Sequence, residues 1–130
     1  MCSSDLAAGS TFYVYNASNV GVYLTDGANT WASSSDERVK EIIEPITDAA
    51  NKVSTLRAVI GRYKTDSSDK RRAFLIAQDV ESVLPEAVSI ADEEKGLLGL
   101  AYSETIPLLV AAIKELNAKV QALESQLKGN

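Results

Sequence analysis

A regular heptad of apolar residues constrains the fold of this chain more than any other feature. The apolar positions alternate in threes and fours: Ile106, Leu109, Ile113, Leu116, Val120, Leu123 and Leu127. This spacing places them on one face of an α-helix and is typical of a coiled-coil seam. A helix packed inside a single chain would account for the first two turns of this stripe, but it would leave the last three turns uncovered. The seam therefore predicts self-association.

The composition excludes several classes of function. The chain has 130 residues, a hydrophobic content of 45% and a net charge of −5, which fits one modest globular domain. The only basic cluster is Lys70-Arg71-Arg72, so nucleic-acid binding is not expected. No apolar run reaches the roughly 20 residues that span a bilayer, so no membrane contact is expected. With no histidine and a single cysteine, Cys2, we expect no metal site, no cofactor and no catalytic pair that contains histidine.

The first 34 residues divide into two parts. Residues 1–10 have no periodicity and are predicted to be a disordered or artefactual N-terminus. Residues 11–24 are rich in the aromatic and β-branched residues that strands favour, and a linker of small residues follows at 30–34. Two short strands bury little surface alone. Residues 11–34 are therefore interpreted either as the end of a longer β-stalk or as a simple hairpin docked on the domain.

Residues 35–130 are predicted to form one α+β domain, with a small antiparallel sheet, short helices and a long C-terminal helix. The helices are expected at 36–43, 47–56, 78–84 and 103–128, and the strands at 57–64, 72–77, 87–90 and 97–102. Thr47 and Ser103 are the expected N-caps of the second and last helices. Pro45 is expected to end or kink the first helix.

A serine lies at the junction where the sequence becomes charged. Ser35 is followed by Asp36 and Glu37, and this pattern is typical of a helix N-cap, in which the serine hydroxyl accepts an N–H of the first turn. A second interpretation pairs the Ser35 hydroxyl with the Lys40 amine, because a serine becomes nucleophilic when a base removes its proton. Spacing alone favours the N-cap.

Three blocks, in a fixed order, resemble the peptidase S74 family, the C-terminal intramolecular chaperone domain of phage tailspikes, tail fibres and endosialidases. The blocks are Ser35-Asp36-Glu37-Arg38-Val39-Lys40, the stretch 71–88 and the stretch 102–109. The resemblance covers residues 31–128, and it implies a homotrimer with the coiled coil at 103–128. The implied partners are sister chains and the upstream β-stalk, whose folding the domain would template. The implied location is a tail fibre or tailspike precursor of the virion, made in the bacterial cytoplasm.

The resemblance also implies an autocatalytic serine endopeptidase that acts once, on its own chain. Ser35 would be the nucleophile and Lys40 the general base, and the bond between Ser34 and Ser35 would be cut, which releases the chaperone. Ser33 and Ser34 are chemically equivalent candidates, and only the family register selects Ser35. A lysine five positions on does not share a face of an ideal helix with that serine, so its side chain must curl back or a neighbouring subunit must shape the site. The alternative function is a trimerisation and attachment module of a fibre protein that never cuts.

Overall fold

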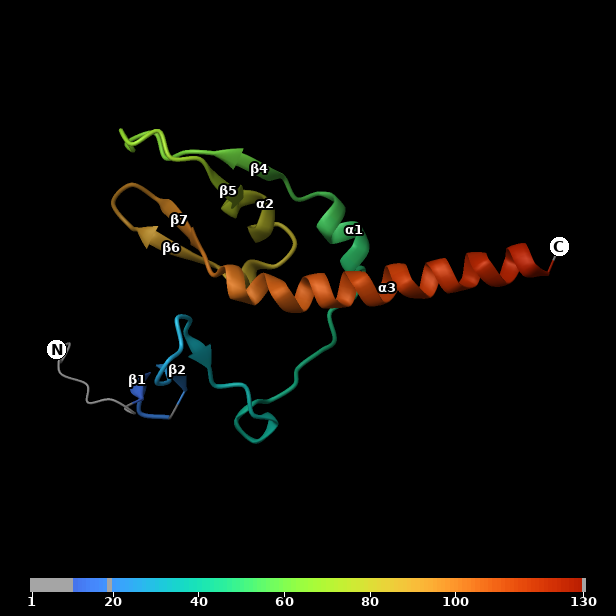
Figure 1. The fold of residues 1–130 in the computed structure, drawn as a ribbon, viewed down its shortest axis with the longest axis horizontal. Helices are drawn as coiled ribbons and strands as arrows, with labels where there is room; N and C mark the ends of the chain where they lie inside the picture. Colours follow the sequence, from blue (N-terminus) through green and yellow to red (C-terminus); the bar gives the residue numbers. More distant parts are fainter. Residues whose placement is uncertain (1–10, 19, 130) are drawn as a thin grey trace. The chain divides into compact units, whose positions relative to one another are not determined.

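The computed structural model describes residues 11–18 and 20–129, which fold as two compact units that divide after Pro45. Figure 1 shows the order of the elements along the chain. The prediction for residues 1–10 lies outside the described residues.

The first unit contains a three-stranded antiparallel sheet. Its strands are β1 (Phe12–Tyr15), β2 (Gly21–Leu24) and β3 (Ala32–Ser33), in the order β1-β2-β3. The two strands expected within residues 11–24 are confirmed, and the turn between them is closed by the Asn16 side chain, which accepts the N–H groups of Ser18 and Val20. The expected linker at 30–34 is wrong in part, because Ala32 and Ser33 pair with β2 as a third strand.

Aromatic contacts stabilise this sheet in place of a buried core. Phe12 packs on Trp31 with 5.9 Å between ring centroids, and Tyr13 packs on Tyr23 at 5.7 Å. None of the described residues from 11 to 45 is buried, and Trp31 remains 53% exposed. The first unit is therefore a thin sheet whose two faces both retain contact with solvent.

The second unit combines two hairpins with three α-helices. Its elements are α1 (Ala49–Ser54), β4 (Ala58–Gly61), β5 (Arg72–Leu75), α2 (Ala77–Glu81), the 3₁₀ helix η2 (Pro85–Ala87), β6 (Val88–Asp92), β7 (Leu97–Leu100) and α3 (Tyr102–Lys128). The α+β class and all four expected strands of this unit are confirmed. The expected single sheet is replaced by separate antiparallel hairpins, β4-β5 and β6-β7.

The helix expected at 36–43 is wrong. Only the 3₁₀ helix η1 (Glu37–Val39) forms, and Lys40 already has extended backbone angles of φ −118° and ψ 138°. The β-branched residues Ile42 and Ile43 are 77% and 89% exposed, so no buried face stabilises further turns. The expected N-cap is also wrong, because the Asp36 carboxylate, not Ser35, accepts the first-turn N–H.

The expected N-caps of the other two helices differ as well. α1 begins at Ala49, and Asp48 holds the N-cap position in the left-handed region (φ 53°) without a side-chain cap. The free N–H groups of Ala49 and Ala50 instead donate to the two carboxylate oxygens of Glu115 on α3, at 2.9 and 2.8 Å. α3 begins at Tyr102, so Ser103 lies inside its first turn. A cap supplied from 66 residues away leaves no local trace in the sequence.

The core of the second unit lies between α1 and α3. Ala49 and Leu108 are fully buried there, and Ala112 is 4% exposed. The buried stripe of α3 runs through Thr105, Leu108 and Ala112, one residue before the heptad positions Ile106, Leu109 and Ile113. The heptad seam therefore faces solvent over its whole length in this single chain, including the first turns that were expected to suit burial inside a monomer.

The long helix α3 is the orange to red helix of Figure 1. Its seven seam residues have exposed fractions between 40% at Leu109 and 77% at Leu127. Within the described residues, no helix is both long and apolar enough to cross a membrane.

Candidate functional site

The structure brings the Ser35 hydroxyl and the Lys40 amine into direct contact. Lys40 Nζ donates a hydrogen bond to Ser35 Oγ over 2.7 Å. Both side chains are exposed to solvent. A distance of 2.7 Å is within the range over which a general base can take a hydroxyl proton. When the amine is neutral, the direction of this hydrogen bond reverses and the serine becomes the donor.

A 3₁₀ turn, not an α-helix, allows this contact within one chain. Val39 N donates to Asp36 O and Lys40 N donates to Glu37 O, both at 3.1 Å. These bonds wind residues 36–39 more tightly than an α-helix. The chain then returns to an extended conformation at Lys40, so its side chain reaches back across five positions to Ser35.

Asp36 and Arg38 form a compact ion pair inside this turn. Asp36 Oδ1 accepts the Arg38 backbone N–H and Arg38 Nε, both at 2.9 Å, and Asp36 Oδ2 accepts Arg38 Nη2 at 2.7 Å. The guanidinium hydrogen bonds hold the pKa of Asp36 below its usual value, and the carboxylate raises the pKa of Arg38. Because Asp36 occupies the Arg38 N–H, that first-turn donor is not free to stabilise an oxyanion.

The residues before Ser35 are held in an extended conformation by β2. Ser33 lies opposite Val22 in the β2-β3 register, and Ser34 N donates to Gly21 O at 3.0 Å. Glycine is required at position 21, because a Cβ there would collide with the carbonyl oxygen of Val14. The Ser34–Ser35 bond therefore lies between a paired strand and a capped turn.

Comparison with protein families places this turn in a known domain. Residues 35–89 match the Peptidase_S74 model, described as "Chaperone of endosialidase". Residues 35–89 therefore belong to the Peptidase_S74 family. The match begins at Ser35, so it includes the whole turn from Ser35 to Lys40, as well as α1, the β4-β5 hairpin and α2.

Several phage proteins share sequence with this chain beyond the Peptidase_S74 segment. Two proteins named "Long tail fiber protein Gp37", from Enterobacteria phages K3 and T2, are each 39% identical over 98 residues, which cover 72% of this chain. A "Probable tail fiber protein" of Escherichia phage Phieco32 is 32% identical over 124 residues, or 92% of this chain. The chain spans only 8%, 7% and 15% of these three relatives.

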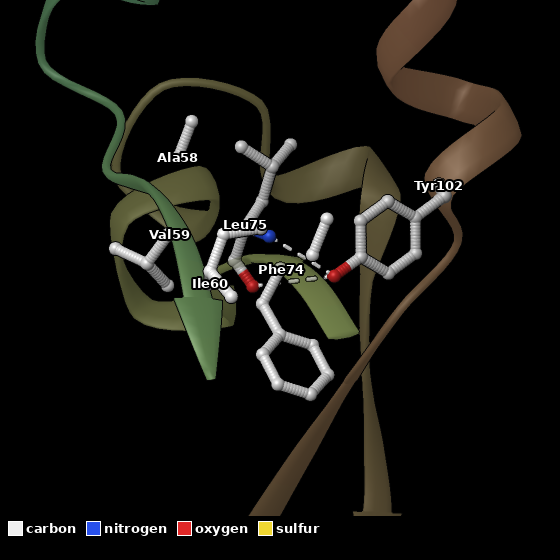
Figure 2. A pocket seen from close by; sticks show the side chains of 7 residues that line it. Ala58, Val59, Ile60, Phe74, Leu75 and Tyr102 are labelled. Carbon is white, nitrogen blue, oxygen red and sulfur yellow. Dashed lines mark hydrogen bonds between the residues drawn. The ribbon is translucent and has the colours of Figure 1, made fainter. Parts of the chain in front are cut away.

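Tyr102, the first residue of α3, contacts strand β5. Its hydroxyl accepts the Leu75 N–H at 3.0 Å and lies 3.4 Å from the Leu75 carbonyl oxygen, to which it donates (Figure 2). β5 pairs only with β4 among the described strands, so Tyr102 covers part of its unpaired edge. The start of α3 is thereby tied to the β4-β5 hairpin of the Peptidase_S74 domain.

An apolar hollow lies beside this contact. Its volume is about 320 Å³, and its lining includes Val59, Phe74 and Leu75 besides Tyr102 (Figure 2). Phe74 pairs with Val59 across the hairpin and packs edge-on against Tyr63 at 5.2 Å. Sequence reasoning did not predict this hollow, because its wall is built from two strands and a helix start that are distant in the sequence.

The hollow contains neither Ser35 nor Lys40. No group of three or more cysteine or acidic side chains in the described part of the chain is placed to hold a metal ion. Among the residues that the structure describes, the arrangement that could support a reaction is therefore the contact between the Ser35 hydroxyl and the Lys40 amine. It directly follows the Ser34–Ser35 bond, which lies between strand β3 and the turn η1.

Proposed function

We propose that this chain is an intramolecular chaperone of a phage tail fibre, which assembles as a homotrimer and then cuts itself free between Ser34 and Ser35. The observation that carries the proposal is the 2.7 Å contact between Ser35 Oγ and Lys40 Nζ within a Peptidase_S74 domain. Similarity to phage long tail fibre proteins supports a place in a tail fibre precursor.

Cleavage begins when the neutral Lys40 amine takes the proton of the Ser35 hydroxyl. Ser35 Oγ then attacks the carbonyl carbon of Ser34, which is the preceding residue of the same chain. The high effective concentration of an intramolecular nucleophile favours this step. The tetrahedral intermediate collapses as the Ser35 nitrogen leaves, and the Lys40 ammonium returns its proton to that nitrogen.

The product of this step is an ester that joins the Ser34 carbonyl to Ser35 Oγ, together with a free amine on Ser35. Water then hydrolyses the ester, giving a carboxylate on Ser34 and restoring the Ser35 hydroxyl. The net reaction is the addition of one water molecule across one peptide bond. Because the active residue becomes a new chain terminus, each chain reacts once.

Self-association is supported by the exposed seam of α3. Apolar side chains at heptad spacing face solvent from Ile106 to Leu127 in the single chain, while another face of the same helix already packs on α1. Sister helices are the partner that a heptad seam fits. Replacing Leu123, which is 58% exposed, by aspartate is expected to convert the assembly to monomers in analytical ultracentrifugation. A matched Ser125→Asp change off the seam should leave the assembly intact, and an unchanged assembly in Leu123→Asp would contradict this step.

The chaperone role follows from the order of events. Assembly through α3 would bring three upstream segments into register, which lowers the entropic cost of non-local strand pairing in a β-stalk. The sheet β1-β2-β3 would then form the last part of that stalk. Release of the chaperone after folding would leave the stalk kinetically trapped, because refolding would lack its template.

The test of cleavage compares four proteins on a denaturing gel: the unaltered chain, Ser35→Ala, Lys40→Ala and Ser33→Ala. The unaltered chain and the Ser33→Ala control are expected to yield two fragments, and the two dyad variants one intact band. An intact band in all four proteins would favour the trimerisation and attachment module that never cuts. Two fragments in Ser35→Ala would contradict the proposed nucleophile.

A further inference from the structure

We propose that Asp36 is the positioning residue of this site: its carboxylate caps the Arg38 backbone N–H and so closes the turn that brings the Lys40 amine to Ser35. This inference rests on the proposed autoproteolysis and names the residue that makes the reactive geometry. Asp36 is the residue of the turn whose side chain bonds both the backbone and a second side chain, through three hydrogen bonds of 2.7–2.9 Å to Arg38.

The turn has little other source of order. η1 contains no buried residue, so no packing energy fixes the conformation of residues 37–39. Ordering an exposed loop costs conformational entropy at every residue. Apart from the Ser35–Lys40 contact itself, the bonds described within the turn that oppose this cost are the two backbone bonds of 3.1 Å and the contacts of Asp36. Removing the Asp36 carboxylate is therefore expected to release the turn and to separate Lys40 from Ser35.

Asp36 is not placed to be the base. Both of its carboxylate oxygens are bonded to Arg38, and these hydrogen bonds lower its pKa, so it remains ionised near neutral pH and accepts no proton there. The ion pair with Asp36 also holds the Arg38 side chain in place. A residue that shapes the turn without touching the reacting atoms acts by positioning, and its loss should lower the fraction of reactive conformers without changing the pH dependence of the reaction.

The capping bond and the ion pair can be separated by substitution. An asparagine side chain caps a turn about as well as aspartate does, because the capping oxygen needs no charge. Asp36→Asn therefore retains an acceptor for the Arg38 N–H and loses the ion pair. Arg38→Ala also loses the ion pair but leaves the Asp36 cap, and Asp36→Ala loses both. Glu37→Ala is the matched control, because Glu37 is an adjacent acid that has no side-chain partner among the described residues.

The first measurement is the rate of self-cleavage of the full chain as a function of pH. Asp36→Ala is expected to lower the rate on the order of 10- to 100-fold, the penalty typical of a misplaced reactive group, with the same pH midpoint as the unaltered chain. Asp36→Asn should recover a large part of that loss, Arg38→Ala should resemble Asp36→Asn, and Glu37→Ala should stay near the unaltered rate. An unaltered rate in Asp36→Ala would overturn the proposal, and so would a shifted midpoint.

The second measurement does not depend on cleavage. An uncleavable Ser35→Ala background lacks the hydrogen bond between Lys40 Nζ and Ser35 Oγ, so only the turn can hold Lys40 near position 35. If the turn does so, a nuclear Overhauser effect is expected between the methyl group at position 35 and the Lys40 Cε protons. Adding Asp36→Ala should abolish this signal, and adding Glu37→Ala should preserve it. If the unaltered chain does not cut while the signal depends on Asp36, the positioning role stands and autoproteolysis fails. If the signal survives Asp36→Ala, the positioning role of Asp36 is wrong, whether or not the chain cleaves itself.

Discussion

The turn η1 and the helix α1 are both short, and an aspartate stands at the N-cap of each, but they are held in different ways. Asp36 caps η1 with its own side chain, and no residue of η1 is buried. Asp48 gives α1 no side-chain cap, and the Glu115 carboxylate binds the first N–H groups of that helix while Ala49 is fully buried. The conformation of η1 thus depends on neighbouring residues, whereas that of α1 depends on residues that are distant in the sequence.

This difference has a functional consequence. A short helix gains most of its stability from tertiary packing. A turn that is closed by its own side chains can instead form whether or not the second unit is folded. Substitutions in the core of the second unit are therefore expected to affect assembly and stability. Substitutions in η1 are expected to affect cleavage alone.

The largest expected effect comes from removing the core contact of α3 with α1. Leu108 is fully buried, and Leu108→Ala should lower the free energy of unfolding by roughly 2–5 kcal/mol. Urea denaturation measures this loss. Leu97→Ala, at a residue that is 54% exposed, is the control and should have a much smaller effect. If the two variants were equally stable, the core described between α1 and α3 would be wrong.

A smaller loss is expected from the cap of α1. Glu115→Ala removes the acceptor of the Ala49 and Ala50 N–H groups and should lower the melting temperature. Asp36→Ala should leave the melting temperature almost unchanged, because η1 buries nothing. Thermal unfolding followed by circular dichroism separates the two, with Glu124→Ala on the exposed part of α3 as the control. Equal melting temperatures for Glu115→Ala and Glu124→Ala would remove the contrast between turn and helix.

The smallest expected effect is a change in acid stability. The hydrogen bonds from Ala50 and Ala49 lower the pKa of Glu115, with Lys119 and Lys52 adding to the effect. The folded pKa is below the unfolded value of about 4.3, so this contribution is present above that pH and is lost as the pH falls through the folded pKa. Glu115→Gln should therefore show a weaker decline of stability over this acidic range. A decline identical to that of the unaltered chain would show that the cap does not contribute.

Elements whose determinants are local or periodic could be predicted from the sequence. The residue types indicated the four strands β4, β5, β6 and β7, and the heptad spacing indicated the long helix. The strand β3, just before Ser35, was expected to be part of a linker, because its small residues have low strand propensity and only pairing with β2 makes it a strand. The cap of α1 by Glu115 could not be predicted either, because no local pattern at Glu115 or at the start of α1 indicates a contact between the two.

The candidate site was predicted from a family pattern more than from physics. Spacing alone favoured Ser35 as an N-cap, yet the adjacent Asp36 takes that position and leaves the Ser35 hydroxyl to Lys40. A serine followed by two acids offers competing caps, and only the backbone geometry decides between them. The roles of Ser35 and Lys40 in cleavage stay predictions.

The intact mass of the purified chain tests the central claim most directly. We expect two species whose masses correspond to residues 1–34 and 35–130, the larger one beginning with a free amine on Ser35, and their sum exceeding the uncut chain by one water molecule. A single species with the full mass, or a larger fragment that begins at Ser33, Ser34 or any other residue, would contradict self-cleavage by Ser35.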